Sequence, residues 1–183
     1  MDTSVTTPEI LTFGRFSISV AGKRVAINWP DETLKVFFCS LLSPLDLFFS
    51  WDRLSRAMWD EPASITSRQR MDERYTRPLK SFLIRELGFN PLITGSEGIH
   101  INQQMIHVDA FEFYSTLLAG LRLLSLDDDD AAHEKFSRAD TLYTGIYLPG
   151  ISGKIIDHTR NDLEALYQTA VMDDARHTRS HRL

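Results

Sequence analysis

The chain has 183 residues, a formal net charge of -5 and an apolar fraction of 43%. This apolar content, with 25% charged residues, predicts a packed core and excludes an intrinsically disordered chain. The single cysteine, Cys39, excludes an internal disulfide framework, and its place in an apolar run predicts a buried thiol in a reducing compartment.

The chain begins with a pattern typical of a β-hairpin followed by a helix. Residues 10–20 alternate and are rich in Ile, Phe, Thr and Val, which predicts a strand. A glycine-bearing turn at 21–22 leads into a second predicted strand at 23–28. Asp31 is placed to cap a helix that runs to about residue 42, because the apolar residues in this stretch recur at helical spacing.

Two further helices are predicted next. Ser50 can cap a short helix between Trp51 and Trp59, two aromatic residues that we expect to be buried. A longer helical segment runs from about residue 66 to 87, where Gly88 is a stop signal. Pro78 lies inside this segment and predicts a kink or a new helix start, because proline lacks the amide donor of a helical residue.

The second half of the chain is predicted to be helical. Helices are expected from Asp109, as a cap, to about 124, then over 130–143 and over 157–177, with a polar, frayed tail at 178–183. Four consecutive aspartates at 127–130 fit either a site for a metal or basic partner or the start of a helix. The helix start is favoured, because carboxylates stabilise the positive end of a helix dipole.

Three helices followed by a glycine-turned hairpin, here residues 92–101, is the element order of a winged helix. In that fold the third helix enters the major groove, where basic side chains neutralise phosphates or pair with guanine. The six predicted DNA-binding residues are Arg68, Arg70, Arg74, Arg77, Lys80 and Arg85. A helix with a solvated surface face fits the same spacing equally well. Four acidic residues in the stretch offset most of its positive charge.

The acidic excess of the chain is not evenly distributed between its two halves. Residues 1–108 contain 12 Lys and Arg and 12 Asp and Glu, whereas residues 109–183 contain 8 and 13. The net charge of -5 therefore belongs to the second half, and it does not argue against DNA binding by the first.

Four segments carry a resemblance to a known family. They are 12–23 (TFGRFSISVAGK), 51–59 (WDRLSRAMW), 80–88 (KSFLIRELG) and 142–150 (LYTGIYLPG). In this order they resemble the Streptomyces antibiotic regulatory protein type of activator, which joins an OmpR-like winged helix to a bacterial transcriptional activator domain. The last segment is the most specific match, and the resemblance covers about residues 11–175.

The resemblance implies a fold, a function and partners. The expected fold is an α+β N-terminal winged helix at 8–104 followed by an all-α, TPR-like helical domain at 105–183, mainly α overall. The expected function is transcriptional regulation by binding double-stranded DNA, with the helical domain serving dimerisation or contact with RNA polymerase. Because no flexible linker separates the two parts, we expect them to pack together.

Several positions depart from the family pattern. Phe82 and Ile84 replace two basic residues of the recognition helix, and Glu97 stands in the wing where Arg or Lys is common. These departures leave an alternative open, a protein–protein adaptor with a winged helix that no longer binds DNA. A continuous positive face on the third helix favours DNA binding, whereas an apolar patch around Phe82 and Ile84 favours the adaptor.

The sequence shows no pattern typical of catalysis. The six histidines lack close metal-binding spacing, and neither 95–98 nor 150–154 matches a nucleophile elbow or a phosphate-binding loop. We therefore expect no enzyme activity, no metal and no cofactor. The first seven residues contain no Lys or Arg, and no apolar run approaches the roughly 18–20 residues of a membrane helix, which predicts a cytoplasmic protein without a membrane partner.

Overall fold

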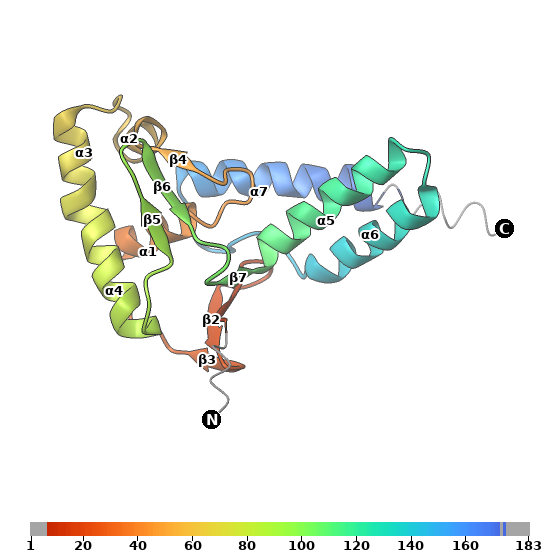
Figure 1. Ribbon diagram of the computed structural model, residues 1–183, viewed down its shortest axis with the longest axis horizontal. Helices are drawn as coiled ribbons and strands as arrows, with labels where there is room; N and C mark the ends of the chain where they lie inside the picture. The colour runs from red at the N-terminus through yellow and green to blue at the C-terminus, as the bar shows by residue number, and fades with distance from the viewer. Residues whose placement is uncertain (1–6, 173, 175–183) are drawn as a thin grey trace.

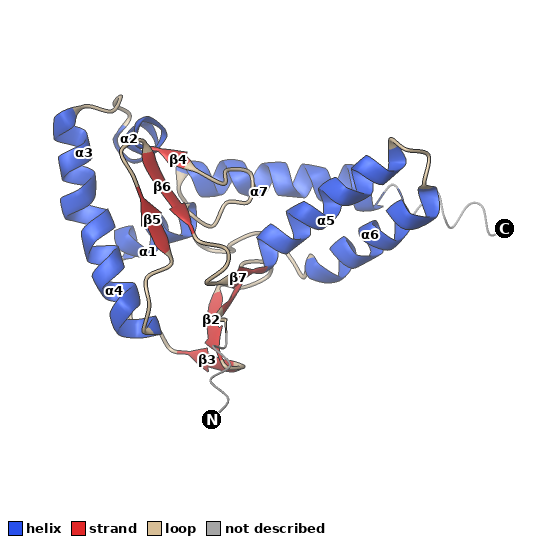
Figure 2. Ribbon diagram, in the orientation of Figure 1, coloured by secondary structure: helices blue, strands red, loops and turns tan. Residues whose placement is uncertain are grey.

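A computed structural model describes residues 7–172 and 174. It has a mixed α/β part built from the first half of the chain and a helical part built from the second (Figure 1, Figure 2). This is the predicted fold class, an α+β winged helix followed by a helical domain.

The first sheet has four short strands in the order β3-β2-β1-β7. Its strands are β1 (Glu9–Leu11), β2 (Ser17–Val20), β3 (Lys23–Val25) and β7 (His107–Val108), with β1 and β7 parallel and the other pairs antiparallel. The prediction of one strand over 10–20 is wrong. The chain turns back at Gly14, whose φ of +69° is a conformation that glycine adopts without strain.

The two capped helices are confirmed. Helix α1 (Glu32–Ser40) follows Asp31, whose carboxylate accepts the Leu34 amide at 2.8 Å. Helix α2 (Trp51–Trp59) follows Ser50, whose hydroxyl accepts the Arg53 amide at 3.2 Å. These bonds satisfy backbone donors that a helix start leaves unpaired, so the caps fix where both helices begin.

The long third helix is confirmed and has three consecutive sections (Figure 1). They are α3 (Ile65–Met71), the π-helical turn η1 (Asp72–Thr76) and α4 (Arg77–Leu87), which ends at Gly88 with φ +79°. The Arg77 amide donates to the Asp72 carbonyl, five residues back. Pro78 explains this wide turn, because its ring would clash with a regular preceding turn and it has no amide to donate.

The predicted hairpin is confirmed as β5 (Leu92–Thr94) and β6 (Gly98–Ile101). A third strand, β4 (Phe49–Ser50), pairs with β6 to give the sheet order β4-β6-β5. Strands β4 and β7 were not predicted, because two-residue strands carry no hydrophobic period.

The helical part consists of α5 (Asp109–Leu124), α6 (Asp129–Leu142), α7 (Lys154–Leu166) and the π-helical turn η2 (Tyr167–Met172). Helices α5 and α6 pack side by side, and a Cβ on Gly120 would lie 2.6 Å from the Phe136 ring. The Asp128 side chain caps α6, which confirms the helix-start interpretation of the aspartate run. The predicted end of the last helix at 177 and the predicted tail at 178–183 lie outside the described residues.

Asp109 does not cap α5 as predicted, since Val108 occupies the cap position. The carboxylate of Asp109, only 5% exposed, instead accepts the Thr12 amide at 2.8 and 2.9 Å, the Thr12 hydroxyl at 2.6 Å and the Phe13 amide at 3.1 Å. Burial raises the pKa of Asp109, although these hydrogen bonds oppose the shift. One carboxylate therefore joins the first residues of α5 to the N-terminal sheet.

Helix α7 lies against the winged helix, where it packs on α1 and α2. The Thr159 hydroxyl donates to the Ser43 hydroxyl at 2.7 Å, and both residues are buried. The Arg160 guanidinium donates to the carbonyls of Leu148 and Ile151 at 2.8 and 2.5 Å, which holds the loop before α7 in place. The expected packing of the two parts is thus confirmed.

One further expectation concerns the single cysteine, and another concerns membrane-spanning helices. Cys39 is 0% exposed, as predicted, and burial raises the pKa of its thiol. Within residues 7–172 and 174, no helix combines the length and the apolar character needed to cross a membrane.

Limited proteolysis should not separate the two parts into stable halves. The segment at Gln103 and Gln104 is exposed, but the bonds of Asp109 and Thr159 connect the parts on both sides of it. We expect a nick there to leave the fragments associated on gel filtration under native conditions. Release of two folded, separately eluting halves would contradict this packing.

Candidate nucleic-acid interface

The long helix and the hairpin are fixed relative to each other by side-chain hydrogen bonds. The Lys80 ammonium on α4 donates to the Thr94 hydroxyl on β5 at 2.6 Å. At the start of α2, the Trp51 indole donates to the Gly95 carbonyl at 3.2 Å and its amide donates to the Glu97 carbonyl at 3.1 Å. The hairpin therefore has a defined position beside the helix, as a wing requires.

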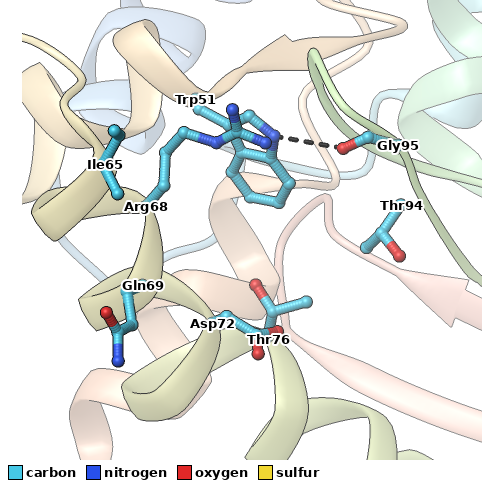
Figure 3. Close-up of a pocket in the computed structure, with 8 residues that line it drawn as sticks. All are labelled: Trp51, Ile65, Arg68, Gln69, Asp72, Thr76, Thr94 and Gly95. Carbon is cyan, nitrogen blue, oxygen red and sulfur yellow. Dashed lines mark hydrogen bonds between the residues drawn. The ribbon is translucent and has the colours of Figure 1, made fainter.

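A groove of about 380 Å³ lies between the helix and the hairpin (Figure 3). It is lined by Trp51, Ile65, Arg68, Gln69, Asp72, Thr76, Thr94 and Gly95. Arg68 extends from α3 toward Trp51 across this groove (Figure 3). The Thr76 hydroxyl is buried and has no hydrogen-bond partner among the described residues. The guanidinium of the exposed Arg68 is a group that a phosphate oxygen can bond.

Three of the six predicted residues lie on the outer face of the helix. The side chains of Arg77 and Arg85 are 70% and 66% exposed, although each pairs with an acid of the same helix, at 2.7 Å to Asp72 and 2.9 Å to Glu86. Arg74 is exposed and pairs with no acid among the described residues. Exposed pairs of this kind contribute little stability, so these arginines remain available to a ligand.

The other three predicted residues have different positions. Arg70 pairs with Glu61 and lies over the Trp59 ring at 3.8 Å, so it has a structural role. Lys80 contacts the wing, and Arg68 lines the groove. The six side chains therefore do not form a single stripe. Three lie on the outer face, two lie on the side of the wing, and Arg70 makes a surface contact with Glu61 and Trp59.

Phe82 does not form the apolar patch that the adaptor interpretation expects. Its side chain is only 2% exposed, and its ring lies 4.8 Å from the ring of Trp29. Ile84 is 52% exposed, but the buried Phe82 does not extend its apolar surface into a patch. Phe82 therefore makes a core contact rather than an exposed apolar surface.

Sequence reasoning missed several groups at this site. Trp51 and Trp59 are mostly buried, as expected, but the sequence did not show that one positions the wing and the other supports Arg70. Thr76 and Thr94 were not singled out, since isolated threonines give no pattern. In the described part of the chain, no group of three or more His, Cys, Asp or Glu is placed to hold a metal ion.

Comparison with known proteins identifies the fold. No protein-family model matches the sequence, and no curated protein matches it. A solved structure, Mycobacterium tuberculosis EmbR in complex with a low-affinity phosphopeptide, matches with a TM-score of 0.60 and 16% identity. The match covers 91% of this chain and 43% of EmbR, so the chain spans less than half the length of that protein. At this identity the likeness shows a shared fold, an EmbR-like winged helix with a helical domain.

Proposed function

We propose that this protein is a transcriptional regulator that binds double-stranded DNA through the helix at 65–87 and the hairpin at 92–101. The observation that carries this proposal is a helix with one buried face, an outer face bearing Arg74, Arg77 and Arg85, and a wing fixed beside it by Lys80. This geometry suits insertion of the helix into the major groove.

Each part of the interface has a role in this proposal. Arg74 and Arg77 read base edges or neutralise phosphates in the major groove. The wing contacts the backbone, and the groove that contains Arg68 takes a phosphate oxygen. We place the protein in the cytoplasm, where DNA is accessible.

Binding by one copy should be weak. Asp72, Glu73, Glu86 and Glu97 lie on the same helix and wing and offset the basic charge. A homodimer formed through the helical part would present two such surfaces and raise the affinity, since the second contact becomes intramolecular. In this proposal the helical part also contacts RNA polymerase.

The adaptor alternative is supported by one observation. Three of the six basic groups, Arg70, Arg77 and Arg85, pair with acids of this chain. A surface whose cations are already neutralised suits a protein partner as well as a phosphate backbone. The alternative predicts no measurable affinity for duplex DNA even at low salt.

Alanine substitutions on the two helices should distinguish these proposals. Arg77→Ala and Arg74→Ala should each weaken binding to a selected duplex about tenfold, because a base-reading arginine contributes about 1–3 kcal/mol of discrimination. Arg56→Ala is the matched control, since Arg56 is an exposed arginine on α2 that pairs with Asp52 at 2.8 Å. It should leave the affinity within about twofold. Fluorescence anisotropy measures each dissociation constant.

The dependence on salt identifies the kind of contact. Loss of a phosphate contact should weaken binding to every sequence and reduce the slope of log affinity against log salt by about one unit. Unchanged binding in both variants would place DNA recognition on another surface. Absence of binding by the parent at low salt would favour the adaptor.

A further inference from the structure

A second groove, of about 560 Å³, lies between the β2–β3 hairpin, the chain that follows it and helix α1. None of its lining residues lines the groove beside the wing. Its volume falls within the range of about 300–1,000 Å³ that is common for small-molecule sites in proteins.

The walls of this groove are mainly apolar. Phe16, Ile27 and Trp29 line it and are only half-buried, so parts of their apolar surface remain uncovered. The Phe16 and Trp29 rings lie 6.3 Å apart, centroid to centroid. Strand β3 is the edge strand of its sheet, so no strand within residues 7–172 covers this side. An apolar ligand would remove this surface from water.

The charged groups of the groove are both cationic. Arg24 is exposed and has no ion-pair partner among the described residues, and none of the lining residues is acidic. Lys35 pairs with Glu32 at 3.2 Å, but the Glu32 side chain is 66% exposed, so this pair is weak and can be exchanged for another anion. The groove therefore combines an apolar body with two cations.

We propose that this groove binds a small amphiphilic acid, with an apolar body against Phe16, Ile27 and Trp29 and a carboxylate at Arg24 and Lys35. Small ligands are often held by such an apolar wall with a few convergent polar groups. A neutral ligand of the same size would lack the charge-assisted bonds to the two cations.

An occupant of this groove would also act on the long helix. Trp29 lines the groove, and its ring lies 4.8 Å from Phe82 on α4 and 5.5 Å from Phe38 on α1. Closely packed side chains transmit displacement, so a ligand against Trp29 shifts Phe82. A consequence for DNA binding rests on the proposed function, whereas ligand binding and the shift at Phe82 do not.

Isothermal titration calorimetry with sodium octanoate tests the site without DNA. We expect saturable binding at one site, and binding of 1-octanol at least about tenfold weaker, because the alcohol lacks the charge. Arg24→Gln should weaken octanoate about tenfold, while Lys23→Gln, the neighbouring exposed cation outside the groove, should not change it. Titration with 1-naphthoate shows whether an aromatic acid binds more tightly than an aliphatic one.

Nuclear magnetic resonance locates the ligand and tests the contact with the helix. The chain has three tryptophans, and only the indole resonance of Trp29, with the amide of Phe82, should move on adding octanoate. Ala26→Phe fills the groove from an exposed position and should abolish binding without lowering stability. Absence of saturable binding, binding that persists in Ala26→Phe, or binding indifferent to Arg24 would each overturn the proposal. Movement of Trp29 without Phe82 would overturn the coupling to the helix.

Discussion

Asp109→Ala is expected to lower the free energy of unfolding by about 4 kcal/mol, because it leaves the Thr12 and Phe13 amides and the Thr12 hydroxyl without an acceptor, and each buried unsatisfied group costs about 1–3 kcal/mol. Asp109→Asn keeps one carbonyl oxygen in place and should cost less than half as much. Urea unfolding followed by circular dichroism measures both changes. Equal losses in the two variants would show that the hydrogen bonds to the carboxylate contribute little.

The same pair of proteins gives a pH test. Burial raises the pKa of Asp109 in the folded state above its ordinary value of 3.8. Between these two pKa values the folded state binds more protons than the unfolded state, so stability falls as pH rises through that window. The stability of the parent relative to Asp109→Asn should therefore increase as pH is lowered from 7 toward 4. A relative stability that decreases instead would mean that the hydrogen bonds outweigh burial.

Phe13→Ala should also destabilise the protein strongly, by about 3–5 kcal/mol, the usual cost of removing a buried aromatic ring. Phe13 is 1% exposed and lies between the rings of Phe113 at 5.1 Å and Tyr143 at 4.9 Å, so it joins the N-terminal sheet to both α5 and α6. Phe48→Ala is the control, because Phe48 is 46% exposed and should cost about 1 kcal/mol or less.

The way in which Phe13→Ala unfolds is as informative as the size of the effect. Because Phe13 lies at the junction, the winged helix and the helical part should lose stability together. Fluorescence, which reports Trp29, Trp51 and Trp59 in the first half, and far-ultraviolet circular dichroism should give coincident transitions. Two separated transitions would mean that the parts fold independently.

The elements with local signals could be predicted from sequence. The side chains of Asp31, Ser50 and Asp128 accept hydrogen bonds from backbone amides at the starts of three helices. In each case the donor lies three residues after the cap. Gly88 ends the long helix in the left-handed conformation that favours glycine. These interactions depend on neighbours in the chain, and so the sequence pattern contains them.

Long-range contacts could not be predicted in this way. Asp109 has the sequence pattern of a helix cap, but its carboxylate bonds Thr12, 97 residues away. Because the Thr12 amide donates to this carboxylate, it is not available for the hydrogen bonds that a continuous strand over 10–20 would make with its neighbour. Phe82 occupies a position that the family resemblance assigns to a basic residue, and only the packing of Trp29 shows that its ring belongs to the core.

The candidate DNA-binding residues were predicted only as a set. Their spacing places basic groups on the third helix, but it does not identify their partners. Arg70 meets Glu61 and Trp59 across the loop between α2 and α3, whereas Arg77 and Arg85 pair within their own helix and stay exposed. The location of acids in space therefore decides which arginines can reach a ligand.

Mapping a selected duplex onto the protein by nuclear magnetic resonance tests the proposed DNA interface most directly. We predict that the backbone amide resonances of residues 68–85 and of the wing turn at 95–98 shift on titration at low salt, while those of α6 do not. Raising the salt concentration should reverse the shifts, because phosphate contacts release bound counterions. Shifts confined to the helical part, or no shifts with any selected duplex, would contradict DNA recognition by this winged helix.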